Sequence, residues 1–186
     1  MAKKSDKISK KPAQMIPPPG REPTPEDLRS IWKTDYIPEW AVPASEDAIA
    51  EAETQLGVKI PGALKEQLAV RNGGYIFLSE ETIPFEDTCP LWTNAIVDGI
   101  LEVEEWESAA DNNWFDDVSD VDDLDLLVIF AGHSEAQLCL DFRAGGAKKR
   151  PSVVYIDVSA TPTELTTIAK TADQFVSAII KSKQEA

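Results

Sequence analysis

The first clear hydrophobic pattern lies between Ser45 and Gly57. Apolar residues at Ile49, Ala52 and Leu56 are three and four positions apart, which places them on one stripe of an α-helix. Ser45 is a favourable N-cap, and acidic residues follow it directly in the first turn. Gly57 is the residue type that ends helices in the left-handed conformation. The pattern therefore predicts a helix over residues 46–56.

A second helix is expected a few residues further along the chain. Pro61 suits a first helical turn, because the N–H that proline lacks would have no partner there. Leu64 and Leu68 recur four residues apart and supply the buried face of this helix. The tripeptide Asn72-Gly73-Gly74 tolerates positive φ and predicts a turn into an apolar strand over residues 75–78.

A short helix is also predicted near the N-terminus. Thr24 is a suitable N-cap, and Asp27 stands three residues later, where a capping box requires an acceptor side chain. Leu28, Ile31 and Trp32 would form the apolar face of this helix.

Beyond residue 78 the apolar runs are short and predict strands, at 95–97, 126–130, 137–142 and 152–158. Alternation of Leu138, Leu140 and Phe142 with polar positions indicates a strand with one buried face. Residues 103–110 predict an acidic helix or turn, and a capping-box pattern at Thr171 predicts a closing helix with Phe175, Ala178 and Ile179 inward. The order of elements indicates the α+β class, with N-terminal helices packed on a central antiparallel sheet and a C-terminal helix.

Composition divides the 186 residues into a tail and one domain. Residues 1–23 are rich in Lys, Pro and Ser and predict a disordered basic tail, whereas residues 24–186 contain enough apolar positions for a single core. The chain has no apolar run of 18 residues and no secretory signal, so neither a membrane span nor export is expected. Its two cysteines, Cys89 and Cys139, are typical of a reduced cytoplasmic protein, although a single bridge between them stays open.

Charge is distributed unevenly along the chain. The formal net charge is −15, yet residues 1–21 carry five Lys and one Arg against one Asp. Between Arg71 and Arg143 there is no Lys or Arg, and the densest acidic segment is 102–125. Such a surface repels nucleic-acid phosphates and attracts a basic protein, so a protein partner is expected and a nucleic acid is not.

Candidate chemistry is sparse. His133 is the only histidine, so a His-rich metal site is excluded, and the one conceivable nucleophile pair joins it to Cys139 across a hairpin. A buried, inert thiol is the simpler interpretation of Cys139, which stands between leucines. The acidic segment lacks the central Gly and terminal Glu of an EF-hand loop, and the glycines before Lys148 lack phosphate-loop spacing. We therefore expect no catalytic residues, no metal and no cofactor.

The stretch from Ile49 to Gly74, followed by a strand ending in Leu140-Asp141 and a strand containing Tyr155, resembles the SUKH superfamily. This superfamily includes fungal Knr/Smi-type regulators of cell-wall synthesis and many bacterial immunity proteins. The resemblance covers roughly residues 45–181 and implies a non-catalytic α+β domain. It assigns a structural role to the motif residues Gly57, Pro61, Asn72, Gly73, Gly74 and Asp141.

Function would then reside on the variable surface, and the acidic segment is the candidate. It is either a solubilising face or a docking surface for a basic toxin domain. Two tryptophans among the carboxylates favour docking, because large aromatic residues are typical binding hot spots, although each is also a candidate core anchor. The candidate partner-binding residues are Glu102, Glu104, Glu105, Trp106, Trp114, Asp116, Asp117, Asp120, Asp122 and Asp123.

Two functions follow from the resemblance and the charge. The first is an immunity protein that neutralises a cognate toxin, basic and of nuclease type, by direct binding. The second is an intracellular scaffold or regulator of the Knr/Smi type. The sequence alone names neither the toxin nor the oligomeric state.

Overall fold

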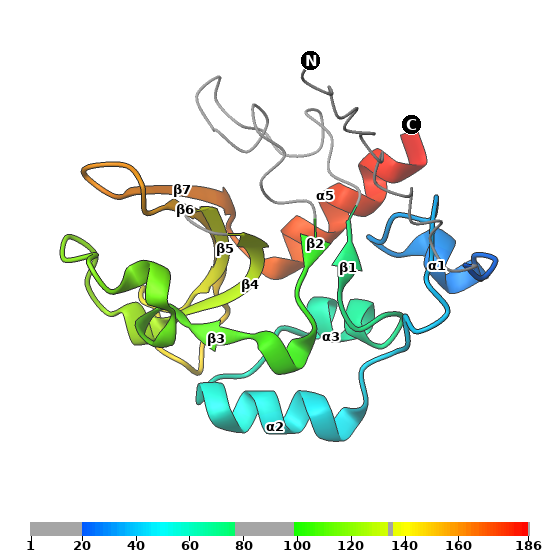
Figure 1. Ribbon diagram of the computed structural model, residues 1–186, viewed down its shortest axis with the longest axis horizontal. Coiled ribbons are helices and arrows are strands. Elements are labelled where there is room, and N and C mark those ends of the chain that lie inside the picture. Colours follow the sequence, from blue (N-terminus) through cyan, green and yellow to red (C-terminus); the bar gives the residue numbers. More distant parts are fainter. Residues whose placement is uncertain (1–19, 77–98, 134–135, 186) are drawn as a thin grey trace, which may run out of the picture.

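The computed structural model describes residues 20–76, 99–133 and 136–185. In this part of the chain three helices come first, a sheet follows, and a fourth helix closes the fold, as expected for the α+β class (Figure 1). The expected strand at 95–97 and residues 77–78 of the preceding strand lie outside the described residues, as does Cys89.

The predicted helices occur where the capping residues indicated. Helix α2 spans Glu46–Leu56, and the Ser45 side chain accepts a hydrogen bond from the N–H of Ala48 at 3.0 Å. Gly57 adopts a left-handed φ of 66°, which confirms it as the residue that ends α2. Helix α3 spans Gly62–Leu68, with Pro61 at the cap position directly before it.

The joint between α2 and α3 is held by a buried carboxylate. Glu53, on α2, accepts a hydrogen bond from the N–H of Ile60 at 3.0 Å and forms ion pairs with Lys59 and Lys65. Val58 and Ile60 are buried on either side of Lys59. The chain therefore folds over the Glu53 side chain, which fixes the angle between the two helices.

After α3 the chain turns into strand β1, Gly74–Tyr75. Gly73 and Gly74 have φ values of 82° and 121°, as the turn prediction required. Asn72 does not take a positive φ. Among the described non-glycine residues, Asp123 is the one with a positive φ. Asn72 contributes its side chain instead, and its contacts are described with the acidic segment below.

The sheet is antiparallel and has seven strands in the described part of the chain. Its order is β1-β2-β4-β5-β6-β7, and β3 pairs with β4 beside β2. The remaining strands are β2 Gly99–Ile100, β3 Glu107–Ser108, β4 Leu127–His133, β5 Ala136–Asp141, β6 Ser152–Asp157 and β7 Glu164–Ala169. The predicted strands at 126–130, 137–142 and 152–158 correspond to β4, β5 and β6.

Sequence reasoning missed β7. This strand has one buried residue, Ile168, and its exposed positions include Thr166 and Thr167. It lies at the sheet edge, where β6 is its one neighbouring strand in the described part of the chain, and most of its side chains are exposed or partly exposed. An edge strand of this kind carries too few apolar residues for hydrophobic periodicity to reveal it.

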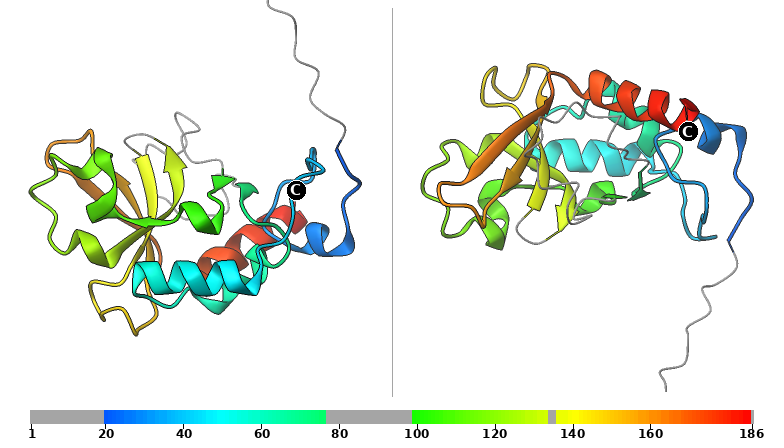
Figure 2. Two further views of the ribbon diagram at one scale, coloured as in Figure 1. Left: turned by 60° about the horizontal axis from the view of Figure 1, so that its bottom comes forward. Right: turned by 90° about the horizontal axis from the view of Figure 1, so that it is seen from above.

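Helices cover one face of the sheet. Helices α2, α3 and α5, the last spanning Ala172–Glu185, lie on the same side (Figure 2). Phe130 of β4 and Tyr155 of β6 point into this core, where Phe175 of α5 packs edge-on against Phe130 at 5.9 Å between ring centroids. Phe175 and Ile179 are buried as predicted, whereas Ala178 is half-buried and Val176 takes the buried position beside Phe175.

The opposite face of the sheet is buried too. Leu127, Ile129, Cys139, Val154 and Ile156 form a second core cluster with residues from the acidic segment. The prediction that β5 has a solvent-facing side was therefore wrong, since residues 136–140 are all buried. The acidic segment supplies the missing cover, which gives three layers: helices, sheet and acidic segment.

The N-terminal segment is fastened to the domain by charged groups. Helix α1 spans Pro25–Arg29 and has the predicted capping box between Thr24 and Asp27. Leu28, expected to face inward, is 56% exposed, whereas Asp27 is fully buried and pairs with Arg21 and Arg71. The burial of Asp27 is the physical reason for the difference, because helix α1 is rotated to bring this carboxylate to the arginines.

Candidate protein-binding surface

The acidic segment, residues 102–125, contains no α-helix of the kind considered for 103–110. It is built from short 3-10 turns at Val103–Glu105, Ala109–Asp111 and Asn113–Phe115, with β3 between the first two. A further turn at Leu124–Leu126 leads into β4. Strand β3 pairs with the first half of β4, so the segment is attached directly to the sheet.

Every third residue of this segment points toward the protein interior. The inward positions, buried or partly buried, are Val103, Trp106, Ala109, Asn112, Phe115, Val118, Val121 and Leu124, and Leu127 continues the pattern at the start of β4. A period of three matches the three residues per turn of a 3-10 helix, in which side chains at i and i+3 are eclipsed. The pattern is visible in the sequence, but it matches neither the helical nor the strand period. It keeps the segment folded and directs the carboxylates outward.

The candidate carboxylates are on the surface. Those of the predicted partner-binding set are all exposed: Glu102, Glu104, Glu105, Asp116, Asp117, Asp120, Asp122 and Asp123. The two tryptophans differ. Trp114 is 48% exposed, whereas Trp106 is only 4% exposed.

The burial of Trp106 favours the core-anchor alternative over a contact with a partner. Its ring packs on Phe130 at 5.7 Å between centroids, and its Nε1–H donates to the carbonyl of Leu101 at 3.1 Å. Both contacts belong to the helix-covered core. Trp106 anchors the acidic segment to this core, which is the alternative that the sequence had left open.

The first part of the acidic segment is positioned by the turn after α3. The Asn72 side chain accepts from the N–H of Val103 at 2.9 Å and donates to Glu104 at 2.7 Å. A Cβ on Gly73 would lie 2.8 Å from the backbone nitrogen of Glu102, so only glycine allows this approach. The Asn-Gly-Gly motif thus places Glu102 and Glu104, in addition to turning the chain.

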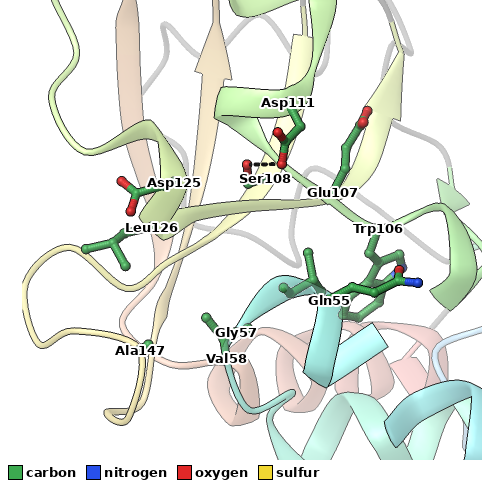
Figure 3. Close-up of a pocket in the computed structure, with 11 residues that line it drawn as sticks. Gln55, Gly57, Val58, Trp106, Glu107, Ser108, Asp111, Asp125, Leu126 and Ala147 are labelled. Atoms are coloured by element: carbon green, nitrogen blue, oxygen red, sulfur yellow. Dashed lines mark hydrogen bonds between the residues drawn. The ribbon is translucent and has the colours of Figure 1, made fainter. Parts of the chain in front are cut away.

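A hollow of about 450 Å³ lies in the middle of the segment, between the end of α2 and β3 (Figure 3). Glu107, Asp111 and Asp125 line it, together with Gln55 of α2 and Ala147 of the loop after β5. Asp111 accepts from the hydroxyl of Ser108 at 2.8 Å, and Glu107 accepts from the side chain of Asn112 at 2.7 Å. The described residues of the lining include no Lys or Arg, so the hollow favours cationic groups.

A second hollow, of about 670 Å³, lies at the far end of the segment. Trp114, Val118 and Asp120 form one wall, and the loop between β6 and β7, residues 158–163, forms the other. Asp120 joins the walls, because its two oxygens accept from the Thr163 hydroxyl at 2.8 Å and the Thr163 N–H at 2.7 Å. These hydrogen bonds lower the pKa of Asp120.

The basic loop after β5 stands beside the last carboxylates. Asp141 accepts from the backbone N–H of Arg143 at 2.9 Å and from its guanidinium at 3.0 and 2.8 Å. Burial disfavours the charged form of Asp141, but the hydrogen bonds from Arg143 outweigh it and hold the pKa of this carboxyl below its usual range. Asp141 thus organises the start of the loop. The N–H groups of Gly145 and Gly146 both donate to the carbonyl of Phe142, so they are committed to the turn.

The two residues of the candidate nucleophile pair occupy different positions in the register of the β4–β5 hairpin. In the β4–β5 hairpin, His133 is opposite Ala136, whereas Cys139 is opposite Ile129. Cys139 is fully buried, and desolvation raises the pKa of its thiol, which keeps it protonated. Among the described residues no group of three or more His, Cys, Asp or Glu side chains is arranged to hold a metal ion.

The described chain is thus an α+β domain in which the acidic segment packs on the face of the sheet opposite the helices. The model of the SMI1 / KNR4 family (SUKH-1) matches residues 43–178, and the chain belongs to this family. This match confirms the resemblance seen in the sequence motif. No individual curated protein matches the chain. Within the described residues, every helix is too short or too polar to span a membrane.

Proposed function

We propose that the chain is a non-catalytic, cytoplasmic protein-binding domain that acts as an immunity protein. In this proposal the acidic segment binds a cognate toxin that is basic and of nuclease type, and so blocks its activity. The observation that carries the proposal is the arrangement of the exposed carboxylates on a segment anchored at every third residue. A merely solubilising face needs charge but no such fixed geometry.

Electrostatics supports a basic protein partner over other classes. The carboxylates from Glu102 to Asp125 stand on a segment without Lys or Arg, so the local field attracts cations and repels nucleic-acid phosphates. Preorganised charges give a partner a fixed pattern to match, which favours specificity and rapid association. The buried, protonated thiol of Cys139 is consistent with a role that needs no nucleophile.

The experiment measures association kinetics with a basic toxin domain, which the proposal expects to be encoded by a neighbouring gene. Asp116, Asp117 and Asp122 are suitable for reversal to Lys, because they are exposed and carry no hydrogen bond that positions the segment in the described structure. Asp120 and Glu104 are left intact, since Asp120 bonds to Thr163 and Glu104 to Asn72. Exposed charges contribute little to stability, so the fold should survive.

The matched control reverses Glu39, Glu51 and Glu66, three exposed carboxylates outside the acidic segment. It changes the net charge by the same amount as the triple aspartate variant. We expect the aspartate variant to slow association at least about tenfold at low salt, and the control to slow it much less. The difference should shrink as the Debye length falls from about 10 Å at 0.1 M salt to about 3 Å at 1 M. Equal effects of the two variants would refute a role for the acidic segment.

The second candidate function is a regulatory scaffold of the Knr/Smi type, and membership of the SMI1 / KNR4 family is the observation that favours it. The two functions differ in what the bound partner does. An immunity protein protects cells that express the toxin, and the triple aspartate variant should lose this protection. Tight binding to a non-toxic cellular protein, without protection against the toxin, would instead support the scaffold.

A further inference from the structure

We infer that the hollow at the far end of the acidic segment is a recognition groove for an arginine-bearing segment of the partner protein. The inference rests on the proposed function for the partner's identity, but it assigns a specific chemical class to one part of the surface. The groove is the hollow of about 670 Å³ between Trp114–Asp120 and the loop at 158–163.

The groove has an aromatic wall held in place before any ligand arrives. The backbone N–H of Trp114 donates to the Asn112 side chain at 2.9 Å, and Phe115, the next residue, is buried in the second core cluster. Trp114 as a whole remains 48% exposed. A large aromatic surface that is fixed at its backbone and open at its ring is a preorganised contact for a ligand.

The rest of the lining combines apolar and acidic groups. Val118, Val158 and Pro162 give the groove apolar walls, and Asp117 and Asp120 are its charged residues. The hydrogen bonds between Asp120 and Thr163 keep the two walls together. Asp117 is exposed, and its carboxylate has no hydrogen bond or ion pair to another described residue that would compete for a cation.

These groups select the occupant by charge and shape. A guanidinium can stack on Trp114 through a cation–π contact while it donates two parallel hydrogen bonds to Asp117. The aliphatic stem of arginine can pack on the apolar walls. A phosphate or carboxylate ligand would instead be repelled by the negative charges of Asp117 and Asp120. A purely apolar side chain would displace the water that hydrogen-bonds to the Asp117 carboxylate and offer no hydrogen bond in its place, which costs free energy.

Lysine fits the groove less well than arginine. Its ammonium is compact and strongly hydrated, so it gains less from the Trp114 ring and cannot make the bidentate contact with Asp117. The groove volume is in the range that holds a ligand larger than one side chain. The occupant is therefore an arginine together with its neighbours in the partner chain.

The test uses the full-length chain and a small probe. N-acetyl-arginine amide is titrated while the indole N–H resonance of Trp114 is followed by NMR, this resonance being identified by its loss in Trp114→Phe. N-acetyl-citrulline amide serves as the neutral isostere and N-acetyl-lysine amide as the other cation. We expect a saturable shift with the arginine probe, with a Kd on the order of millimolar for so small a ligand, a weaker shift with the lysine probe and none with the citrulline probe.

Variants then assign the contacts. Trp114→Ala and Asp117→Asn should each weaken binding of the arginine probe about tenfold. Because Trp114→Ala removes the indole resonance, its binding is measured from the backbone amide resonances of residues 158–163. Trp40→Ala is the matched control, since Trp40 is 67% exposed and lies outside the groove. Equal binding of the citrulline probe, or arginine binding that survives both groove variants, would overturn the inference.

The toxin assay separates this inference from the proposed function. If the arginine probe binds as expected but the charge reversals leave toxin association unchanged, the groove stands and the immunity proposal fails. If the reversals slow toxin association while no probe binds and Trp114→Ala leaves toxin dissociation unchanged, the acidic surface stands and the arginine groove is wrong.

Discussion

Replacing Asp27 by Asn tests whether a buried ion pair fastens the N-terminal segment to the domain. The Asp27 carboxylate is fully buried and accepts hydrogen bonds from Arg21 at 2.5 Å and from Arg71 at 3.1 Å. Thr24 adds two more, from its N–H at 3.0 Å and its hydroxyl at 2.9 Å. The Arg71 side chain is only 4% exposed and packs over the ring of Trp32, so it has little access to water.

The expected loss follows from the burial of Arg71. Removing one partner of a buried pair leaves an uncompensated charge and costs about 3–5 kcal/mol. Asparagine retains one oxygen acceptor, so we expect about 3 kcal/mol for Asp27→Asn. For a domain of this length each kcal/mol lowers Tm by about 2–4 °C, which gives a fall of roughly 6–12 °C.

The pH dependence has a definite sign. Burial disfavours the charged form of Asp27, but hydrogen bonds from Arg21, Thr24 and Arg71 outweigh it and lower the pKa of this carboxyl far below its usual range. The folded state therefore binds fewer protons than the unfolded state, and the stabilisation is present above pH about 4 and declines as the pH falls. Between pH 7 and pH 3 the native protein should lose about 1 kcal/mol through this group, and Asp27→Asn should not.

The assay is urea unfolding followed by circular dichroism at pH 7 and at pH 3. Glu26→Gln is the control, because Glu26 is the neighbouring residue, its side chain is 62% exposed, and its ion pair with Arg29 is at 3.8 Å. It should change the free energy of unfolding by less than about 0.5 kcal/mol. Equal stability of Asp27→Asn and Glu26→Gln, or a difference from the native protein that does not shrink at pH 3, would refute the reasoning.

Two further stability predictions use the same unfolding assay. Gly57→Val should lower the free energy of unfolding by about 1–2 kcal/mol through backbone strain alone, since φ is 66° and nothing lies within 4 Å of the added Cβ. A loss of stability no larger than that of Gly62→Ala would contradict the left-handed cap. Trp106→Ala should cost about 3–5 kcal/mol, whereas Trp114→Ala should stay within about 0.5 kcal/mol, and similar losses at the two sites would contradict the assignment of Trp106 to the core and Trp114 to the surface.

Local signals in the sequence were sufficient for the elements near the motif. Ser45 and Gly57 act through their own backbone and side-chain conformations, so the ends of α2 follow from residue type. The apolar runs of β4, β5 and β6 are long enough to identify the three strands, although the burial of both faces of β5 did not follow from them. The exposure of the carboxylates was also predictable, since unpaired charges avoid burial.

Tertiary structure decided the properties that depend on distant partners. Asp27 is buried and Leu28 exposed because Arg71, far along the chain, offers a charge to neutralise. Glu53 can be buried because the chain after α2 brings the N–H of Ile60 and the ammonium groups of Lys59 and Lys65 to its carboxylate. No local pattern specifies these pairings, because the cost of burying a charge is offset only by groups that folding brings together.

The acidic segment shows both kinds of information in one stretch. Its composition alone determined that it is negative and attracts cations. Which of its tryptophans is buried and which is exposed was decided by the fold, because Trp106 packs on Phe130 of the sheet and Trp114 lines a hollow beside the 158–163 loop. The physical reason is that the burial of a side chain depends on which elements pack over it. Those elements are distant in the sequence, so local residue patterns do not predict the burial.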